Sequence, residues 1–249
     1  MLNKFYHSTI RRAIIAFGNM FNNITIDRRD SDGEVIQTLR IPLAYAPRQK
    51  FLTRIAQQPV VEESTKQIIL PRMSFEMTGI TYDPQRRISV VQQNRTINET
   101  NNTLNKQYAP TPYNMTVNLY VYSKNQDDAL QIVEQILPYF NPDYNLSLKA
   151  VPSMGITHDL AIIIDSVSYE DDYEGDLTTR RSIIWTLTFT VKLNFYGPVN
   201  KQGVIRRVEV DTFYDSELIK TLTKYDVTVS PSTAKPGDSI TYVENFEDF

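Results

Sequence analysis

The sequence contains no cysteine, and its two histidines, His7 and His158, lie far apart. Without cysteine there is no disulfide, thiolate nucleophile, cysteine-ligated zinc or iron–sulfur cluster. The histidines lack the HxH or HExxH spacing of metal sites, so each is expected to be a surface or capping residue. The sequence therefore predicts no cofactor and no metal site.

Glycine-rich loops and long apolar runs are also missing. The eight glycines are scattered, without a phosphate-binding loop or a GxSxG nucleophile elbow. The longest apolar run near the N-terminus is Ala13–Phe17, whereas a membrane span needs about 20 residues. We expect a soluble, unexported protein without a membrane partner. A net charge of −3 argues against a nucleic-acid ligand, because phosphate binding needs excess positive charge.

One acidic segment, Glu170–Asp176, contains carboxylates that could bind a metal ion or take part in catalysis. Carboxylate-rich loops bind Ca²⁺, and paired carboxylates perform acid–base catalysis. The segment lacks the ligand spacing and the closing glutamate of an EF-hand. It also separates two long predicted strands, where Gly175 accepts the positive φ of a turn. A solvated hairpin tip is the preferred interpretation, and a carboxylate-based hydrolase is a remote alternative.

Hydrophobic periodicity predicts an α+β fold: a central twisted antiparallel sheet with a few flanking helices, long loops and an extended C-terminal arm. In the clearest strand, Ser182–Phe195, every second residue from Ile183 onward is apolar, and threonines face the other way. Helices are expected from Ser8 to Phe21, after Pro47, and from Asn125 to Pro138, with Ser8 and Asn125 as caps. Further strands are expected over 24–26, 35–43, 73–82, 115–121, 158–169 and 204–214.

The predicted domain organisation is a single domain over 1–214 and an acidic arm over 215–249. Within the domain, 85–110 is expected to be a long polar loop, because half of residues 92–107 are asparagine or glutamine and cannot build a core. The arm has seven acidic residues against three lysines. It is either a solvated end or a docking arm for a basic partner surface.

Five Arg-Arg pairs and 15 tyrosines suit protein contacts. Arginine forks form interface ion pairs, and tyrosine combines a large contact area with one polar tip. The two arginines of a pair in a strand point to opposite faces, so these pairs cannot form one basic patch. Isolated solvated arginines are the alternative. The candidate interface residues are Arg11, Arg12, Arg86, Arg87, Tyr108, Arg180, Arg181, Arg206, Tyr225 and Phe246.

A series of short segments runs through about residues 5–195. Its members are Phe5-Tyr6 with Arg11-Arg12, Phe21–Ile26, Ile41–Ala46, Ile69–Arg72, Gln131–Pro142, Arg180-Arg181 and Trp185–Phe189. In order and rough spacing the series resembles the tail sheath stabiliser, or tail completion, proteins of contractile-tailed bacteriophages. The helix run Gln131–Phe140 and the tryptophan strand are its most specific parts.

This resemblance implies a non-enzymatic virion protein that assembles in the host cytoplasm into a hexameric ring at the head-proximal end of the tail. Such a ring caps and stabilises the sheath and tube, and it gives neck proteins an attachment platform. The implied partners are the protein itself, the tail sheath protein, the tail tube or terminator protein and neck proteins, without sequence-specific nucleic acid. A tail-tube terminator or a head–tail adaptor ring is the alternative within phage structure.

Overall fold

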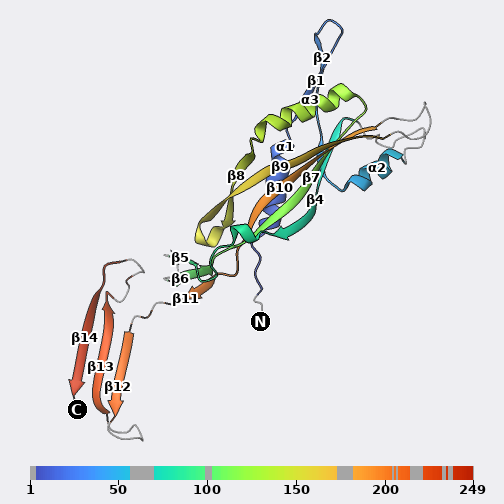
Figure 1. The fold of residues 1–249 in the computed structure, drawn as a ribbon. Coiled ribbons are helices and arrows are strands. Elements are labelled where there is room, and N and C mark those ends of the chain that lie inside the picture. Colours follow the sequence, from blue (N-terminus) through green and yellow to red (C-terminus); the bar gives the residue numbers. More distant parts are fainter. Residues whose placement is uncertain are drawn as a thin grey trace, which may run out of the picture. The chain divides into compact units, whose positions relative to one another are not determined.

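The computed structural model describes residues 4–56, 70–98, 103–172, 182–203, 205, 207–213, 221–231, 234 and 238–248 (Figure 1). The chain divides into two compact units. The larger unit comprises Tyr6–Arg87 and Pro110–Phe195; the smaller comprises Met1–Phe5, Ile88–Ala109 and Tyr196–Phe249. This discontinuous division differs from the predicted one, in which 1–214 formed one domain.

A six-stranded sheet forms the body of the larger unit, with the strand order β3-β4-β7-β10-β9-β8. Neighbouring strands are antiparallel, apart from the parallel pair β3–β4. The strands are β3 (Leu43–Tyr45), β4 (Arg72–Tyr82), β7 (Thr111–Ser123), β8 (Asp143–Val151), β9 (Ile156–Asp172) and β10 (Ser182–Phe195). The predicted α+β class and its central antiparallel sheet are confirmed; β8 had not been predicted.

The central strand β10 shows how the sequence selects the faces of this sheet. Leu187 and Phe189 are fully buried, whereas Thr186 and Thr188 at the alternate positions are half-buried. Successive side chains of a strand point to opposite faces, so the alternation separates an apolar face from a polar one. The register pairs Phe189 with the buried Val117 of β7, and the two strands therefore share these faces.

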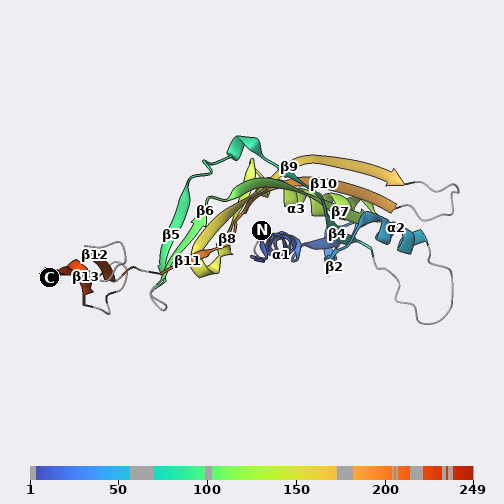
Figure 2. The same ribbon diagram turned by 90° about the horizontal axis from the view of Figure 1, so that it is seen from below.

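Two helices, α1 (Thr9–Phe21) and α3 (Gln126–Ile136), cover the apolar face, and the sheet curves around α1 (Figure 2). The rings of Phe17, Phe21 and Phe140 have centroids 5.3, 5.6 and 5.1 Å from that of Phe189. Neither predicted cap residue, Ser8 or Asn125, makes a side-chain capping bond. Both residues occupy the predicted N-cap positions, but burial of the apolar stripes and not a side-chain cap holds the helices.

The remaining helices of the described larger unit are short. The helix predicted after Pro47 is α2 (Arg48–Ala56), which packs on the polar side of the sheet, where the Phe51 and Tyr122 rings are 5.5 Å apart. Pro138 ends α3 as predicted and lies in a 3₁₀ turn. The three 3₁₀ turns are η1 (Pro84–Arg86), η2 (Leu137–Tyr139) and η3 (Pro152–Met154).

A hairpin of β1 (Thr25–Arg29) and β2 (Val35–Arg40) is held by side chains of α3. The Gln131 amide accepts from Asp27 N and donates to Asp27 O, both at 3.1 Å. Arg28 forms an ion pair with Asp128 at 2.7 Å. The helix therefore satisfies the free backbone edge of β1 in the way that another strand would.

In the smaller unit, β5 (Gln93–Asn98), β6 (Thr103–Tyr108) and β11 (Asn200–Gln202) form a three-stranded sheet. The prediction of an irregular loop was wrong for β5 and β6. Backbone groups make the ladder, so an Asn- and Gln-rich sequence can pair without an apolar stripe. Gln107 also donates from Nε2 to Gly197 O at 2.6 Å.

The chain continues into a second three-stranded antiparallel sheet with the order β12-β13-β14. Its strands are β12 (Arg207–Phe213), β13 (Thr221–Ser230) and β14 (Thr241–Asp248). We call this the arm sheet. The predicted boundary at residue 215 falls between β12 and β13, so the extended arm has regular structure of its own and begins earlier than predicted.

Candidate interaction surfaces

The polar face of the six-stranded sheet is a network of short polar side chains. Thr190 Oγ1 donates to the carboxylate of Asp165 at 2.5 Å. Asn118 Nδ2 donates to Tyr120 OH at 3.2 Å, and this hydroxyl donates to Glu76 at 2.9 Å. Mutual hydrogen bonds hold these side chains in place; Tyr120 is buried in a cluster with Phe51 of α2, whereas Asp165 leaves an exposed polar surface. Such a surface suits a wet contact with another protein.

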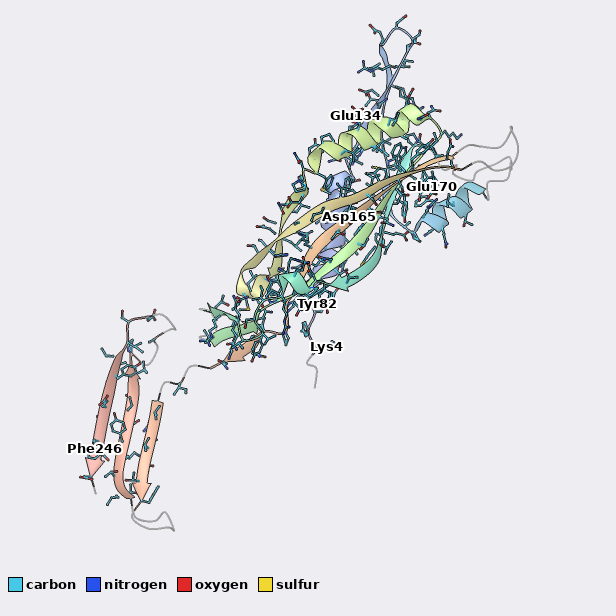
Figure 3. The ribbon with its side chains drawn as sticks, viewed as in Figure 1. Lys4, Tyr82, Glu134, Asp165, Glu170 and Phe246 are labelled. Carbon is cyan, nitrogen blue, oxygen red and sulfur yellow. The ribbon has the colours of Figure 1, made fainter. Side chains whose placement is uncertain are left out.

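At the end of β9, Glu170 forms an ion pair with Arg48 at the start of α2 (Figure 3). This partner lowers the pKa of Glu170, and the same hydrogen bond raises the pKa of Arg48. A general acid needs the opposite shift, because it must hold its proton near neutral pH. Glu170 thus anchors α2. Residues 173–176 of the acidic segment lie outside the described residues.

The buried ionisable groups of the larger unit are structural as well. Burial raises the pKa of Tyr122 to about 12, and the Tyr122 hydroxyl lies 3.2 Å from Ser74 Oγ. Desolvation by burial lowers the pKa of His158, whose Nδ1 lies 3.2 Å from Asn194 Nδ2. Half-buried on β9, His158 is neither the capping nor the freely exposed residue that was expected. Among the described residues, no group of three His, Cys, Asp or Glu side chains could hold a metal ion.

Arg86 and Arg87, predicted as interface residues, differ in availability. Arg86 forms an ion pair with Asp83 at 2.8 Å and donates to Tyr113 O and Asn114 Oδ1. Its hydrogen bond lowers the pKa of Asp83. Arg86 thus holds η1 to the start of β7, whereas Arg87 is exposed.

Of the first arginine pair, Arg11 is exposed on α1, and Arg12 donates from Nη1 to Lys149 O on β8 at 2.5 Å. Tyr108 ends β6 and is exposed. Arg180, Arg181 and Arg206 lie outside the described residues. The structure therefore brings none of these predicted arginines together as one site in its described part.

Tyr225 and Phe246 are brought together, because they are directly opposed on β13 and β14. They lie on one face of the arm sheet, which is largely apolar. Its apolar members are Val208, Val210, Tyr225, Val227, Val229, Tyr242 and Phe246. The opposite face carries ion pairs, Arg207–Asp226 at 2.9 Å and Lys224–Glu209 at 2.5 Å. The sheet is thus amphipathic, and Val210, Tyr242 and Phe246 are 47%, 65% and 64% exposed.

A second surface that the sequence did not reveal is a groove of about 560 Å³ in the larger unit. It lies where α1, β1, α3 and β8 meet. Arg40 stands beside it, donating from Nη2 to Asn22 O and Asn23 Oδ1 at 3.0 and 2.8 Å. Its lining includes Met20, Asn23, Ile24, Pro138, Tyr139 and Tyr144. Because the walls come from two stretches far apart in the sequence, residues 20–24 and 134–144, no local pattern signals the groove.

Comparison with known proteins agrees with the resemblance seen in the sequence. Residues 4–248 match the family described as "T4-like virus Myoviridae tail sheath stabiliser". The chain is 31% identical over 221 residues to "Tail completion protein gp15" of Enterobacteria phage T4, covering 85% of this chain and 79% of that protein. Among the described helices, none is long and apolar enough to cross a membrane. The chain belongs to the tail sheath stabiliser family of T4-like myoviruses.

Proposed function

We propose that this protein forms a hexameric ring that caps the sheath and tube at the head-proximal end of the tail and provides the platform for neck proteins. The family match over residues 4–248 is the observation that supports this proposal most directly. The same match makes the chain a structural tail protein of the virion and not an enzyme. Within that role, the surfaces described above support a ring and its contacts with partner proteins.

The larger unit supplies the rigid body that a ring subunit needs. Among the described residues, its core contains 21 buried apolar side chains, most of them from the two helices and the strands of the sheet. Interiors packed at this density deform little, so contacts on one side of the unit hold those on the other side at a fixed angle. A head-to-tail contact closes into a ring only if that angle fits, and rigidity keeps it constant from subunit to subunit.

The outer edge of β9 offers a subunit contact. The described β8 pairs with β9 only up to Ile163, so β9 continues past the end of its neighbour on that side. A strand edge pairs readily with another chain, and Asp165 and Glu170 restrict the partners to those with compatible charge. We assign this edge and the polar face to contacts within the tail.

Mass in solution and imaging test the ring. Full-length protein should give a sixfold particle in negative-stain images, alone or after addition of purified tail sheath, and light scattering should give the matching mass. Particles should bind at the ends of sheath tubes. A protein that stays monomeric with sheath ends present contradicts the proposal.

Removing residues 205–249 tests whether the arm docks on a partner in the tail. The larger unit should fold unchanged, because none of its strands or helices lies in this segment. Sheath retention should fall in a sedimentation assay. The matched control is the double variant Arg207→Ser and Lys224→Ser, which alters the charged face and leaves the apolar face intact. Full retention by the truncated protein would show that the arm does not dock.

A further inference from the structure

The arm sheet is a single layer with a bare apolar face. Val208, Val210, Tyr242 and Phe246 are each more than 40% exposed, although strand alternation gathers them on one side. A three-stranded sheet is stable when another layer covers its apolar face. The charged face carries the ion pairs and is suited to water. The apolar face is therefore the side that requires a partner.

The charge of the arm sheet limits which partner surface can cover its apolar face. The three strands contain two basic residues, Arg207 and Lys224, and six acidic ones. Both basic residues are paired within the sheet, whereas Glu244 and Asp248 flank Phe246 on the apolar face. Two arm sheets packed face to face would bring these carboxylates together, and like charges at an interface core are unfavourable. The partner surface should be apolar with a basic rim.

The groove at the end of α1 has this chemistry. Its wall is built from apolar side chains such as Met20, Ile24 and Tyr144, and Tyr139 stands exposed at its edge. Arg40 is fixed beside it by bonds to Asn22 and Asn23. One carboxylate, Glu134, lies in the groove wall on α3 (Figure 3). An acidic arm is therefore favoured at the other side of the groove, next to Arg40.

We infer that Phe246 and the apolar face of the arm sheet dock into the α1 groove of a second copy of this chain, with Glu244 and Asp248 toward Arg40. The inference rests on the proposed ring, because a groove on one subunit and an arm from the next make a head-to-tail contact. Aromatic side chains that enter a pocket commonly dominate an interface, which gives Phe246 the anchoring role.

The small area of the arm face explains why this contact needs other contacts between the two copies. A face of three strands, each about eight residues long, covers roughly 400 Å². Each partner in a stable interface buries about 800 Å². Docking of the arm alone is therefore weak, and it becomes strong when other surfaces already hold the two copies together.

Disulfide trapping tests the contact cleanly, because the natural chain has no cysteine. The double variant Phe246→Cys with Tyr139→Cys should form, in oxidised rings, covalent oligomers that run as a ladder on a non-reducing gel. The matched control, Asn245→Cys with Tyr139→Cys, places its thiol on the charged face of the same strand. It should give at least tenfold less covalent oligomer.

Two further outcomes identify other occupants. A disulfide confined to the monomer band shows that the arm covers the groove of its own chain, and this overturns the inference. Rings without any cross-link show that the arm docks on another tail protein, which also overturns it while the proposed ring survives. If the wild-type chain forms no ring even on sheath ends, the proposed function itself fails, together with this inference.

The substitution Phe246→Lys gives an independent readout. It should raise the protein concentration needed for half-maximal ring assembly about tenfold, whereas Asn245→Lys should leave it within about twofold. Glu244→Lys should also weaken assembly, and Arg40→Glu in the same chain should partly restore it by reversing the charge pair. Equal effects of the Phe246 and Asn245 variants would contradict docking through the apolar face.

Discussion

The six-stranded sheet and the arm sheet are built on the same strand pattern but differ in what covers them. In β10, Phe189 is fully buried beneath the rings of α1 and of the segment after α3. In β14, Phe246 occupies an equivalent alternating position and is 64% exposed. Alternation thus determines which face is apolar, and a second element determines whether that face is a core or a contact surface.

The largest expected contrast comes from truncating these two phenylalanines. Phe189→Ala should destabilise the larger unit by about 3–5 kcal/mol, because it leaves a cavity among three other rings. Phe246→Ala should leave the unfolding free energy of that unit unchanged. Urea unfolding followed by fluorescence measures this directly, since the single tryptophan, Trp185, lies on β10 of the larger unit. Similar losses in the two variants would mean that the arm is part of the same core.

The α+β class, the main helices and the strands with a clear apolar stripe could be predicted from sequence, since burial of one face imposes a period on the residues. β10 and α1 are such elements. Strands without this constraint were missed. β5 and β6 are held by backbone pairing, and β13 and β14 lie in a Ser-, Pro- and Asp-rich segment whose short stripes resemble a tail.

The candidate surfaces were less predictable because they depend on tertiary partners. Arg86 and Arg87 are adjacent and chemically identical, yet of the two Arg86 alone contacts Asp83 and the start of β7. Tyr225 and Phe246 are 21 positions apart in sequence and meet only through the register of β13 and β14. The groove beside α1 needs two distant stretches, residues 20–24 and 134–144, at once. Spacing along the chain contains none of this information.

A smaller difference in stability is expected between variants of two neighbouring aspartates in the first turn of α3. Asp128→Asn should destabilise the larger unit by about 2 kcal/mol, because the Asp128 side chain is 5% exposed and accepts two charge-assisted bonds from Arg28. Asp127→Asn is the matched control: it removes the same charge from the same turn, but Asp127 is exposed. Equal losses would assign the effect to the helix dipole and not to the ion pair.

The next smaller loss of stability is expected at the hairpin of β1 and β2. Side chains of α3 hold this hairpin to the larger unit. Gln131→Ala removes both bonds to Asp27 and should cost about 1 kcal/mol, since backbone groups of β1 lose their partner. Glu134→Ala, on the exposed side of the helix, is the control. Hydrogen exchange of residues 25–40 should quicken in the first variant only.

The smallest effect is a pH dependence that belongs to the larger unit alone. Burial keeps the pKa of His158 below its ordinary value of 6.5. Below pH 6.5 the unfolded chain therefore binds a proton that the folded chain takes up only at lower pH, so stability decreases as the pH falls from about 7 to 5. His158→Gln should flatten this slope in Trp185-monitored unfolding.

In the arm sheet, the ion pairs lower the pKa of Glu209 and raise the pKa of Lys224 and Arg207. Glu209, Lys224 and Arg207 therefore stay charged across the same range, and hydrogen exchange of β12–β14 should not change with pH beyond its intrinsic rate. A slope that persists in His158→Gln, or that appears in the arm, would assign the acid sensitivity to other groups.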